Sequence, residues 1–222
     1  MKGRGLGRVA GYVDGFNLYH GMRGRFGRKW LWLDVEALVR LLQPEQGELS
    51  LVRYFTAGVR DDPGAAARQT RYLNGLIAHC QVLQIHLGHY QAKDRRCRFC
   101  GATWRTYEEK ETDVSIAVRL VSDANADRFD TAVVVSADGD LVPAIEEVRR
   151  VKPSAQVVVA FPPGRSSDRL RTAAGSRLRI NESMLRRSQL PEEILAPDGV
   201  MLAKPAYWMP GAGDKGSRSR AP

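Results

Sequence analysis

The chain has 222 residues, 43% of them hydrophobic and 27% charged, a balance that supports a packed core and excludes wholesale disorder. Its net charge of +9 at pH 7 favours a polyanionic partner. No apolar stretch approaches the ~20 residues of a membrane span, and no apolar signal-peptide core follows the basic first residues. We therefore expect a cytoplasmic protein that does not associate with membranes.

Apolar runs of strand length alternate with helical patterns along the chain. Strands are predicted at 9–13, 51–56, 82–87, 131–136 and 156–161, and helices at 33–42, 64–79, 113–123, 141–151 and 165–174. Because the strands are apolar along their whole length, they are typical of a parallel sheet that is covered on both faces. The pattern predicts an α/β fold, a parallel sheet with helices on both faces.

Residues 1–190 carry this pattern and are predicted to form one domain. Within it, residues 91–110 are a polar, basic and aromatic insertion that contains two of the cysteines. Residues 191–222 are a C-terminal extension. Its end, 203–222, is rich in Pro, Gly, Ser and basic residues, which predicts a disordered tail in which Tyr207–Trp208 is the segment able to dock on the body.

Carboxylates follow two of the predicted strands. Asp14 comes directly after the first strand, and Asp138 and Asp140 come after the fourth. In open α/β sheets, ligands bind outside the carboxyl ends of the strands. If both strands are central and parallel, these carboxylates point into one crevice.

Asp113 is a further candidate for that crevice, because it lies in the first turn of a predicted helix. Two neighbouring apolar stripes follow it, Ile116, Ala117 and Leu120 and then Val114, Val118 and Val121. This pattern predicts a largely buried helix with Asp113 at its inward edge. The alternative is an ordinary first-turn acid that complements the helix dipole.

Carboxylates that share a crevice repel each other, and a divalent cation relieves the repulsion. Oxygen ligands favour Mg²⁺ or Mn²⁺ over Zn²⁺, and such an ion can polarise a phosphoryl oxygen and activate water. Basic segments flank the acids, since residues 1–29 hold seven Lys/Arg against one acid and residues 164–187 hold seven Arg against two acids. The pattern favours hydrolysis of a phosphodiester, and separate turn and cap aspartates are the alternative.

The motifs DGFN, EEKETD and SADGD, in this order on alternating elements, resemble the NYN domain family of the PIN-like, FEN-like nuclease superfamily. The resemblance runs from about Val9 to about Ile180 and includes VPAIEEVRR after the acidic turn. It implies a Rossmann-like, PIN-like fold and a ribonuclease that cleaves single-stranded or structured RNA with Mg²⁺ or Mn²⁺. A non-catalytic RNA-binding or regulatory module on the same fold is the alternative.

Carried over residue by residue, the resemblance assigns roles to the matching positions. Asp14, Asp113 and Asp138 would be the catalytic metal ligands, and Asp140 would be a further acid of the site. The polar residues Asn17 and Ser136 would orient the carboxylates or a phosphate, and Lys110 would contact the scissile phosphate. An ordinary exposed lysine is the alternative for Lys110. From its strand, Arg53 would face either a substrate phosphate or an internal acid.

CRFCG at 97–101 is a C-x-x-C-G knuckle, a turn that suits structural zinc. The chain has three cysteines, an odd and low count that argues against a disulfide framework. A closed zinc site needs four ligands. We favour His89 as a partner of Cys97 and Cys100, because it begins the loop that leads to them. The other candidates are His79, Cys80 and His86.

Two alternatives stay open for this knuckle. Its cysteines can be free, reduced thiols, or a second subunit can complete the zinc site in a homodimer. The arginines near Trp104 resemble a platform on which single-stranded bases stack. A tryptophan that anchors the loop on the core is the alternative.

Overall fold

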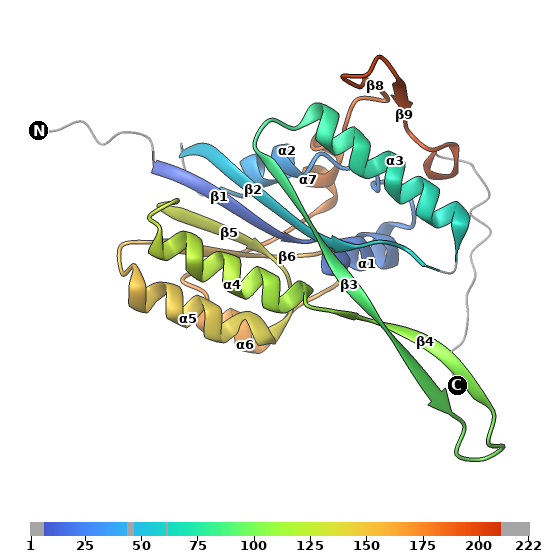
Figure 1. The fold of residues 1–222 in the computed structure, drawn as a ribbon. Helices are drawn as coiled ribbons and strands as arrows, with labels where there is room; N and C mark the ends of the chain where they lie inside the picture. Colours follow the sequence, from blue (N-terminus) through green and yellow to red (C-terminus); the bar gives the residue numbers. More distant parts are fainter. Residues whose placement is uncertain (1–6, 44–46, 61, 210–222) are drawn as a thin grey trace, which may run out of the picture.

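The computed structural model describes residues 7–43, 47–60 and 62–209, without the side chains of 89–93 and 105–110. Its centre is a sheet in the order β4-β3-β2-β1-β5-β6-β7 (Figure 1). All paired neighbours are parallel except β3 and β4. The strands of this sheet are β1 (Gly7–Asp14), β2 (Gly47–Ala57), β3 (Leu83–Arg96), β4 (Thr103–Lys110), β5 (Thr131–Val135), β6 (Gln156–Phe161) and β7 (Ser176–Arg179).

Helices cover both faces of the sheet, which confirms the predicted α/β architecture. The first face carries α1 (Gly15–Phe26), α2 (Val35–Leu42), α3 (Pro63–His79) and α7 (Glu182–Arg187). The second face carries α4 (Thr112–Asn125), α5 (Val142–Val151) and α6 (Asp168–Ala173). None of these helices is both long and apolar enough to cross a membrane within the described ranges.

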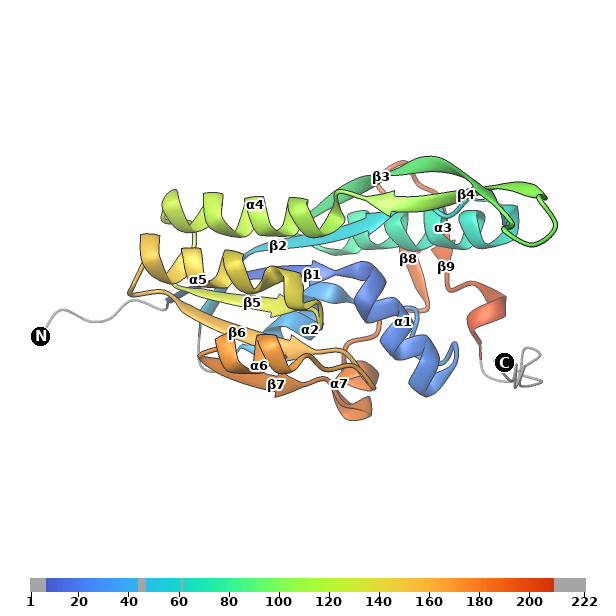
Figure 2. The same ribbon diagram turned by 90° about the horizontal axis from the view of Figure 1, so that it is seen from below.

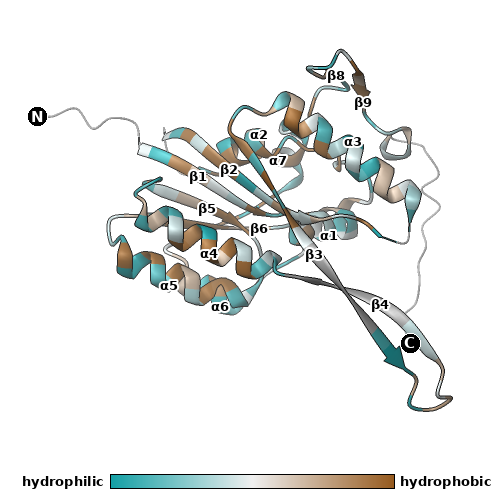
Figure 3. Ribbon diagram, viewed as in Figure 1, coloured by the Kyte–Doolittle hydropathy of each residue, from teal (hydrophilic) through white to brown (hydrophobic). Residues whose placement is uncertain are grey.

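The strand sequences explain why two helical layers form. Successive side chains of a strand point to opposite faces, and here both sets are apolar. Val13 of β1 belongs to the core under α1–α3, whereas Ala10 and Tyr12 belong to the core under α4 and α5. Figure 3 shows hydrophobic segments in the central strands and alternating hydrophobic and hydrophilic bands on the helices that cover them. Burial on both faces therefore follows from the composition of the strands.

Helix α1 was absent from the sequence-based prediction. It begins directly after Asp14, whose side chain accepts a hydrogen bond from the Asn17 backbone and so caps the helix. Its three glycines weaken the helical pattern, since Gly lowers helix propensity. At Gly21 a Cβ would lie 2.8 Å from the Pro163 carbonyl oxygen, so close packing explains that glycine. The cap was the available signal, together with buried Leu18 and Met22 one turn apart.

The predicted insertion 91–110 is part of a β-hairpin. Strand β3 pairs with β2 as far as Gly88 and then continues, paired antiparallel with β4, from His89 to Arg96. This hairpin arm, residues 89–110, projects well beyond the body (Figure 1). Antiparallel backbone pairing between β3 and β4 forms the arm.

The predicted second apolar stripe of α4 is only partly buried, since Val121 packs against the core and the other two valines do not. Ile116 and Leu120 are fully buried against the sheet, but Val114 and Val118 are 65% and 59% exposed. The reason is helical geometry, because residues at positions i and i+2 of a helix lie roughly 160° apart around its axis. Val114 and Val118 each stand two residues from Ile116 and therefore face away from the sheet.

The C-terminal extension packs on the body through a short hairpin, β8 (Glu193–Leu195) with β9 (Met201–Ala203), and the turn η2 (Ala206–Trp208). Trp208 is only 7% exposed and packs against Trp32 and Tyr72, with ring centroids 6.3 and 5.9 Å apart. This contact confirms the expected docking of Tyr207–Trp208. Most of the predicted disordered tail, residues 210–222, lies outside the described residues.

A buried ion pair connects the centre of the sheet to α4. Arg53 of β2 donates to Asp123 of α4 through Nε and Nη2, at 2.7 and 3.0 Å, and both side chains are about 5% exposed or less. The Tyr12 hydroxyl donates to the same carboxylate at 2.8 Å. Arg53 therefore pairs with an internal acid, which was one of the two roles predicted for it. Its guanidinium is not available to a substrate phosphate.

We expect Asp123→Asn to lower the free energy of unfolding by about 3 kcal/mol or more, because it leaves the Arg53 charge buried without a counter-ion. Urea unfolding measures this change. Glu147→Gln is the matched control, since its pair with Arg150 is solvent-exposed and should contribute little. Equal small effects in the two variants would contradict a stabilising buried pair.

Candidate active site

The site forms where the two central strands end. Strands β1 and β5 are parallel neighbours, and Val13 pairs with Val135. The residues that follow, Asp14 and Ser136, therefore emerge side by side at the carboxyl edge of the sheet. Figure 2 shows these two strand ends together at the start of α1.

Asp14 is 2% exposed and both of its oxygens accept hydrogen bonds. Oδ1 accepts from the Asn17 backbone N–H at 2.9 Å, and Oδ2 accepts from the Ser136 hydroxyl at 2.9 Å. The first bond caps α1, and the second ties β1 to the end of β5. Asp14 is thus both a helix cap and a buried carboxylate aimed at its neighbour strand.

Ser136 also connects Asp14 to the acids beyond β5. Its oxygen accepts the backbone N–H of Asp138 at 3.1 Å, and Asp138 Oδ1 accepts the N–H of Asp140 at 2.9 Å. These bonds shape the turn η1 (Gly139–Leu141). A chain of hydrogen bonds therefore links Asp14, Ser136 and Asp138 at this edge of the sheet, and the two aspartates also act as caps.

The charge of Asp14 is costly in this position. Burial raises the pKa of Asp14 above its ordinary value of 3.8, and repulsion by Asp138 raises it further. The hydrogen bonds from Asn17 and Ser136 act in the opposite direction. A buried carboxylate beside a second one is the environment that a cation would stabilise.

Arginines from the loop after β6 and from α6 reach this site. Arg165 Nη1 donates to Asn17 Oδ1 at 3.3 Å, and Arg169 Nη1 lies 3.4 Å from Asp140 Oδ1. Both side chains belong to the basic segment 164–187. They place positive charge beside the acids, where a phosphate would need it.

His20 is a site residue that sequence reasoning missed. It lies on α1 beyond Asp14, and desolvation and the charge of Arg165 lower its pKa, against the opposite effect of Asp14. Its imidazole is therefore neutral near pH 7. The sequence feature that could have indicated His20 was its spacing from Asp14, but that spacing is informative only if α1 is recognised as a helix.

Asp113 lies in the exposed first turn of α4 and not at the buried inward edge of the helix that we predicted for it. Among the described residues, no three His, Cys, Asp or Glu side chains form a group that could hold a metal ion. The structure links Asp14 to Asp138 indirectly, through Ser136. The Lys110 side chain lies outside the described residues.

The knuckle and His89 are far apart along the arm. His89 pairs with Lys110 at the base, whereas Cys97 follows the last pair, Arg96 with Thr103. An extended strand rises roughly 3.3 Å per residue, so the path from His89 to the tip is about 23 Å. Zinc binds its ligand atoms at about 2.0–2.3 Å, so our preferred ligand His89 does not reach Cys97 and Cys100 within one chain.

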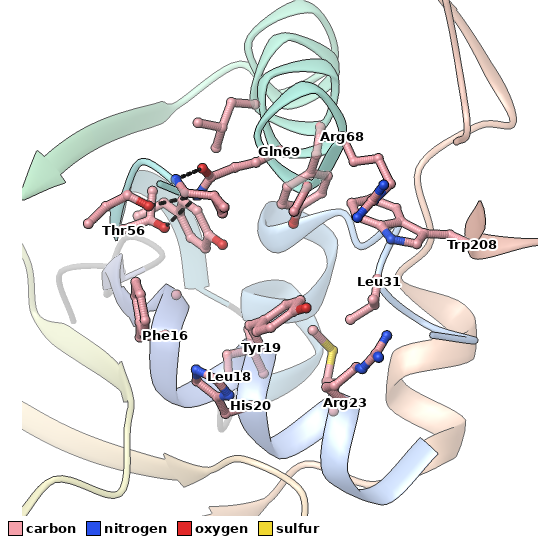
Figure 4. A pocket seen from close by; sticks show the side chains of 18 of the residues that line it. Phe16, Leu18, Tyr19, His20, Arg23, Leu31, Thr56, Arg68, Gln69 and Trp208 are labelled. Atoms are coloured by element: carbon pink, nitrogen blue, oxygen red, sulfur yellow. Dashed lines mark hydrogen bonds between the residues drawn. The ribbon is translucent and has the colours of Figure 1, made fainter. Parts of the chain in front are cut away.

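A cavity of about 380 Å³ lies next to the acids, between α1, α3 and η2. Figure 4 shows Phe16, Tyr19 and His20 from α1 around this space, with Arg68 and Gln69 from α3 opposite them. The lining also includes the aromatic rings of Tyr54, Tyr72, Tyr207 and Trp208 and the guanidinium of Arg23. Its size and aromatic walls suit a flat ring that carries a negative group.

Tyr207 forms part of the cavity wall because two arginines hold it. The guanidinium carbons of Arg28 and Arg68 lie 3.8 and 4.3 Å from its ring centroid. These cation–π contacts attach the C-terminal extension to the body. The extension thereby helps to shape the cavity.

Comparisons with known proteins agree with this architecture. The model of the NYN domain family matches residues 8–180. A curated relative, 6-hydroxy-3-succinoylpyridine 3-monooxygenase of Pseudomonas putida, is 27% identical over 236 aligned residues, which cover 89% of this chain and 74% of the relative. A crystal structure of a protein of unknown function from Vibrio parahaemolyticus has a TM-score of 0.55 at 20% identity and covers 86% of this chain and 100% of that one. This last likeness supports the fold alone.

We expect Asp14→Asn to raise the melting temperature at pH 7 in EDTA. The folded pKa of Asp14 is raised, so the folded state holds its proton more tightly than the unfolded chain, and stability falls as pH rises above about 4 through the folded pKa. Asparagine keeps the cap without the charge. Thermal unfolding between pH 4 and pH 8 measures the effect, which should shrink towards pH 4.

Asp130→Asn is the matched control for this measurement. Hydrogen bonds from Arg8 hold the pKa of Asp130 at about 2, so that carboxylate stabilises the fold above its unfolded pKa. The control should therefore be less stable than wild type at pH 7. A loss of stability at pH 7 in both variants would show that the ionised Asp14 carboxylate does not destabilise the fold.

Proposed function

The chain belongs to the NYN domain family, and on that premise we propose that it is a metal-dependent ribonuclease acting at the carboxyl ends of β1 and β5. The observation that carries the proposal is the buried Asp14 carboxylate, linked through Ser136 to Asp138. A fold alone does not define an activity, so the argument rests on this site.

The donor set fits a small hard cation. Mg²⁺ usually keeps several waters and takes one or two protein carboxylates together with substrate phosphates, so Asp14 and Asp138 suffice as its protein ligands. Asp113 and Asp140 would then bind through water or after a side-chain rotation. When bound, Mg²⁺ or Mn²⁺ would polarise the phosphoryl oxygen and activate water.

The remaining residues have roles that need no metal. Arg165 and Arg169 bind the non-bridging oxygens of the RNA phosphate, since guanidinium matches phosphate geometry. Ser136 and Asn17 hold Asp14 in its orientation. His20, whose imidazole is electrostatically coupled to Asp14 and Arg165, is our candidate for the group that would accept a proton from the attacking water.

We expect wild-type protein to cleave a labelled mixed-sequence RNA with Mn²⁺ or Mg²⁺ and not with EDTA. Asp138→Asn should lower the rate about a hundredfold or more, because the metal supplies several kcal/mol of charge stabilisation. Asp127→Asn is the control, since Asp127 pairs with Arg8 and Lys152 at the opposite edge of the sheet. Gel analysis of the RNA with time measures all three proteins.

Binding separates the ribonuclease from the RNA-binding module. RNA affinity of Asp138→Asn should remain close to that of wild type, because the arginines that contact phosphate are unchanged. If neither protein cleaves RNA with any of the metals while both bind it equally, the chain is the non-catalytic module.

The cavity beside the site favours a second candidate function, the binding of a small aromatic acid. The Pseudomonas putida relative is named for action on a pyridine with a succinoyl side chain. In this chain the aromatic walls would stack on such a ring, and Arg23 and Arg68 would face its carboxylate.

We expect 6-hydroxy-3-succinoylpyridine to raise the melting temperature of wild type if this second function holds, because a ligand that binds only the folded state stabilises it. Arg23→Gln should abolish the shift, whereas Arg25→Gln, on the same helix but outside the cavity lining, should not. The absence of any shift at millimolar ligand would remove this candidate.

A further inference from the structure

We propose that two copies of this chain share one Zn²⁺ ion, held by Cys97 and Cys100 of each copy at the tips of their hairpin arms. This inference is independent of the proposed nuclease activity. It concerns a metal centre and an interface away from the Asp14 site.

The turn at the tip is built as a metal knuckle. Cys97 N–H donates to the Ala102 carbonyl at 2.7 Å, and Gly101 N–H donates to the Cys97 carbonyl at 3.0 Å. Gly101 adopts φ +73, a left-handed conformation that glycine accepts without strain. Hydrogen bonds from the backbone amides of Cys100 and Phe99, and one with the Cys100 side chain, lower the pKa of the Cys97 thiol. This arrangement holds both thiols on one side of the turn, as a C-x-x-C zinc site requires.

The described part of one chain does not supply the ligands that would close this site. Zinc in structural sites takes four ligands, and the chain has three cysteines and four histidines in all. His89 is held at the base of the arm. The others belong to the body, where His79 pairs with Asp34 at 3.2 Å and His86 stacks on Phe55 with ring centroids 4.8 Å apart.

The two remaining candidates are also engaged in the body. Cys80 ends α3 with its thiol 3.7 Å from Asp34 Oδ1, and His20 lies on α1. Among the described residues, no acid completes a group of three with the knuckle. Two knuckles from two chains supply four thiolates, which is a complete Cys₄ site.

The position of the tip makes this pairing sterically simple. The arm carries the knuckle far from the rest of the chain, so two tips can meet without contact between the bodies (Figure 1). Phe99, between the two cysteines, is 100% exposed, and Trp104 is 48% exposed. Joining two tips would cover this apolar surface, which a free monomer leaves in water.

Charge explains why the metal is needed for the pairing. Arg95, Arg96 and Arg98 surround the knuckle, so two bare tips repel each other. A Zn²⁺ ion with four thiolates carries a formal charge of about −2 and offsets these arginines. The dimer should therefore form with zinc and separate without it.

The test uses the full-length chain, loaded with zinc, reduced with a phosphine and freed of unbound metal by gel filtration. We expect half a zinc ion per chain by elemental analysis, and a mass twice that of the 24.7 kDa chain by light scattering. A strong chelator should return the monomer, and added Zn²⁺ should restore the dimer.

The double variant Cys97→Ser and Cys100→Ser should be a zinc-free monomer whose circular dichroism matches that of wild type. Cys80→Ser is the matched control and should keep both the zinc and the dimer. One zinc ion per monomer, no bound zinc, or a dimer that persists in the double variant would each overturn the proposal. None of these readouts depends on RNA cleavage.

Discussion

The parallel pairing of β1 with β5 is the constraint on which the candidate site depends. It brings the ends of the two central strands together, so Asp14 lies within hydrogen-bonding distance of Ser136. Every later feature follows from that contact. Asp14 caps helix α1, and Ser136 accepts the Asp138 N–H in the turn after β5. Apolar burial on both sides keeps the two strands in register.

The site combines structural and chemical demands in the same atoms. Asp14 caps α1 and braces β5, yet its burial next to Asp138 makes its charge unfavourable in the absence of a cation. Unfavourable local interactions of this kind are common at functional sites, where they lower stability in the absence of the ligand. It also explains why the cap and metal interpretations of the acidic motifs are compatible, since one carboxylate can do both.

Three parts of the molecule besides the central strands β1 and β5 give this chain its individual character. The C-terminal extension closes the aromatic cavity through Trp208 and Tyr207. The basic segment 164–187 supplies arginines to the acids. The hairpin arm presents the cysteine knuckle at a distance. Together they set the positions of the sites that we propose for a metal, an anion, an aromatic ring and a second copy of the chain.

The sequence by itself determined the layered α/β fold and the acids at the strand ends, because apolar period and strand-end chemistry are local properties. Tertiary structure decided the rest. Arg53 pairs with Asp123 and not with a phosphate, because a buried charge needs a counter-ion inside the protein. Val114 and Val118 face solvent because the sheet covers only one side of α4. Strand pairing keeps the chain extended from His89 to Arg96, so His89 lies far from Cys97.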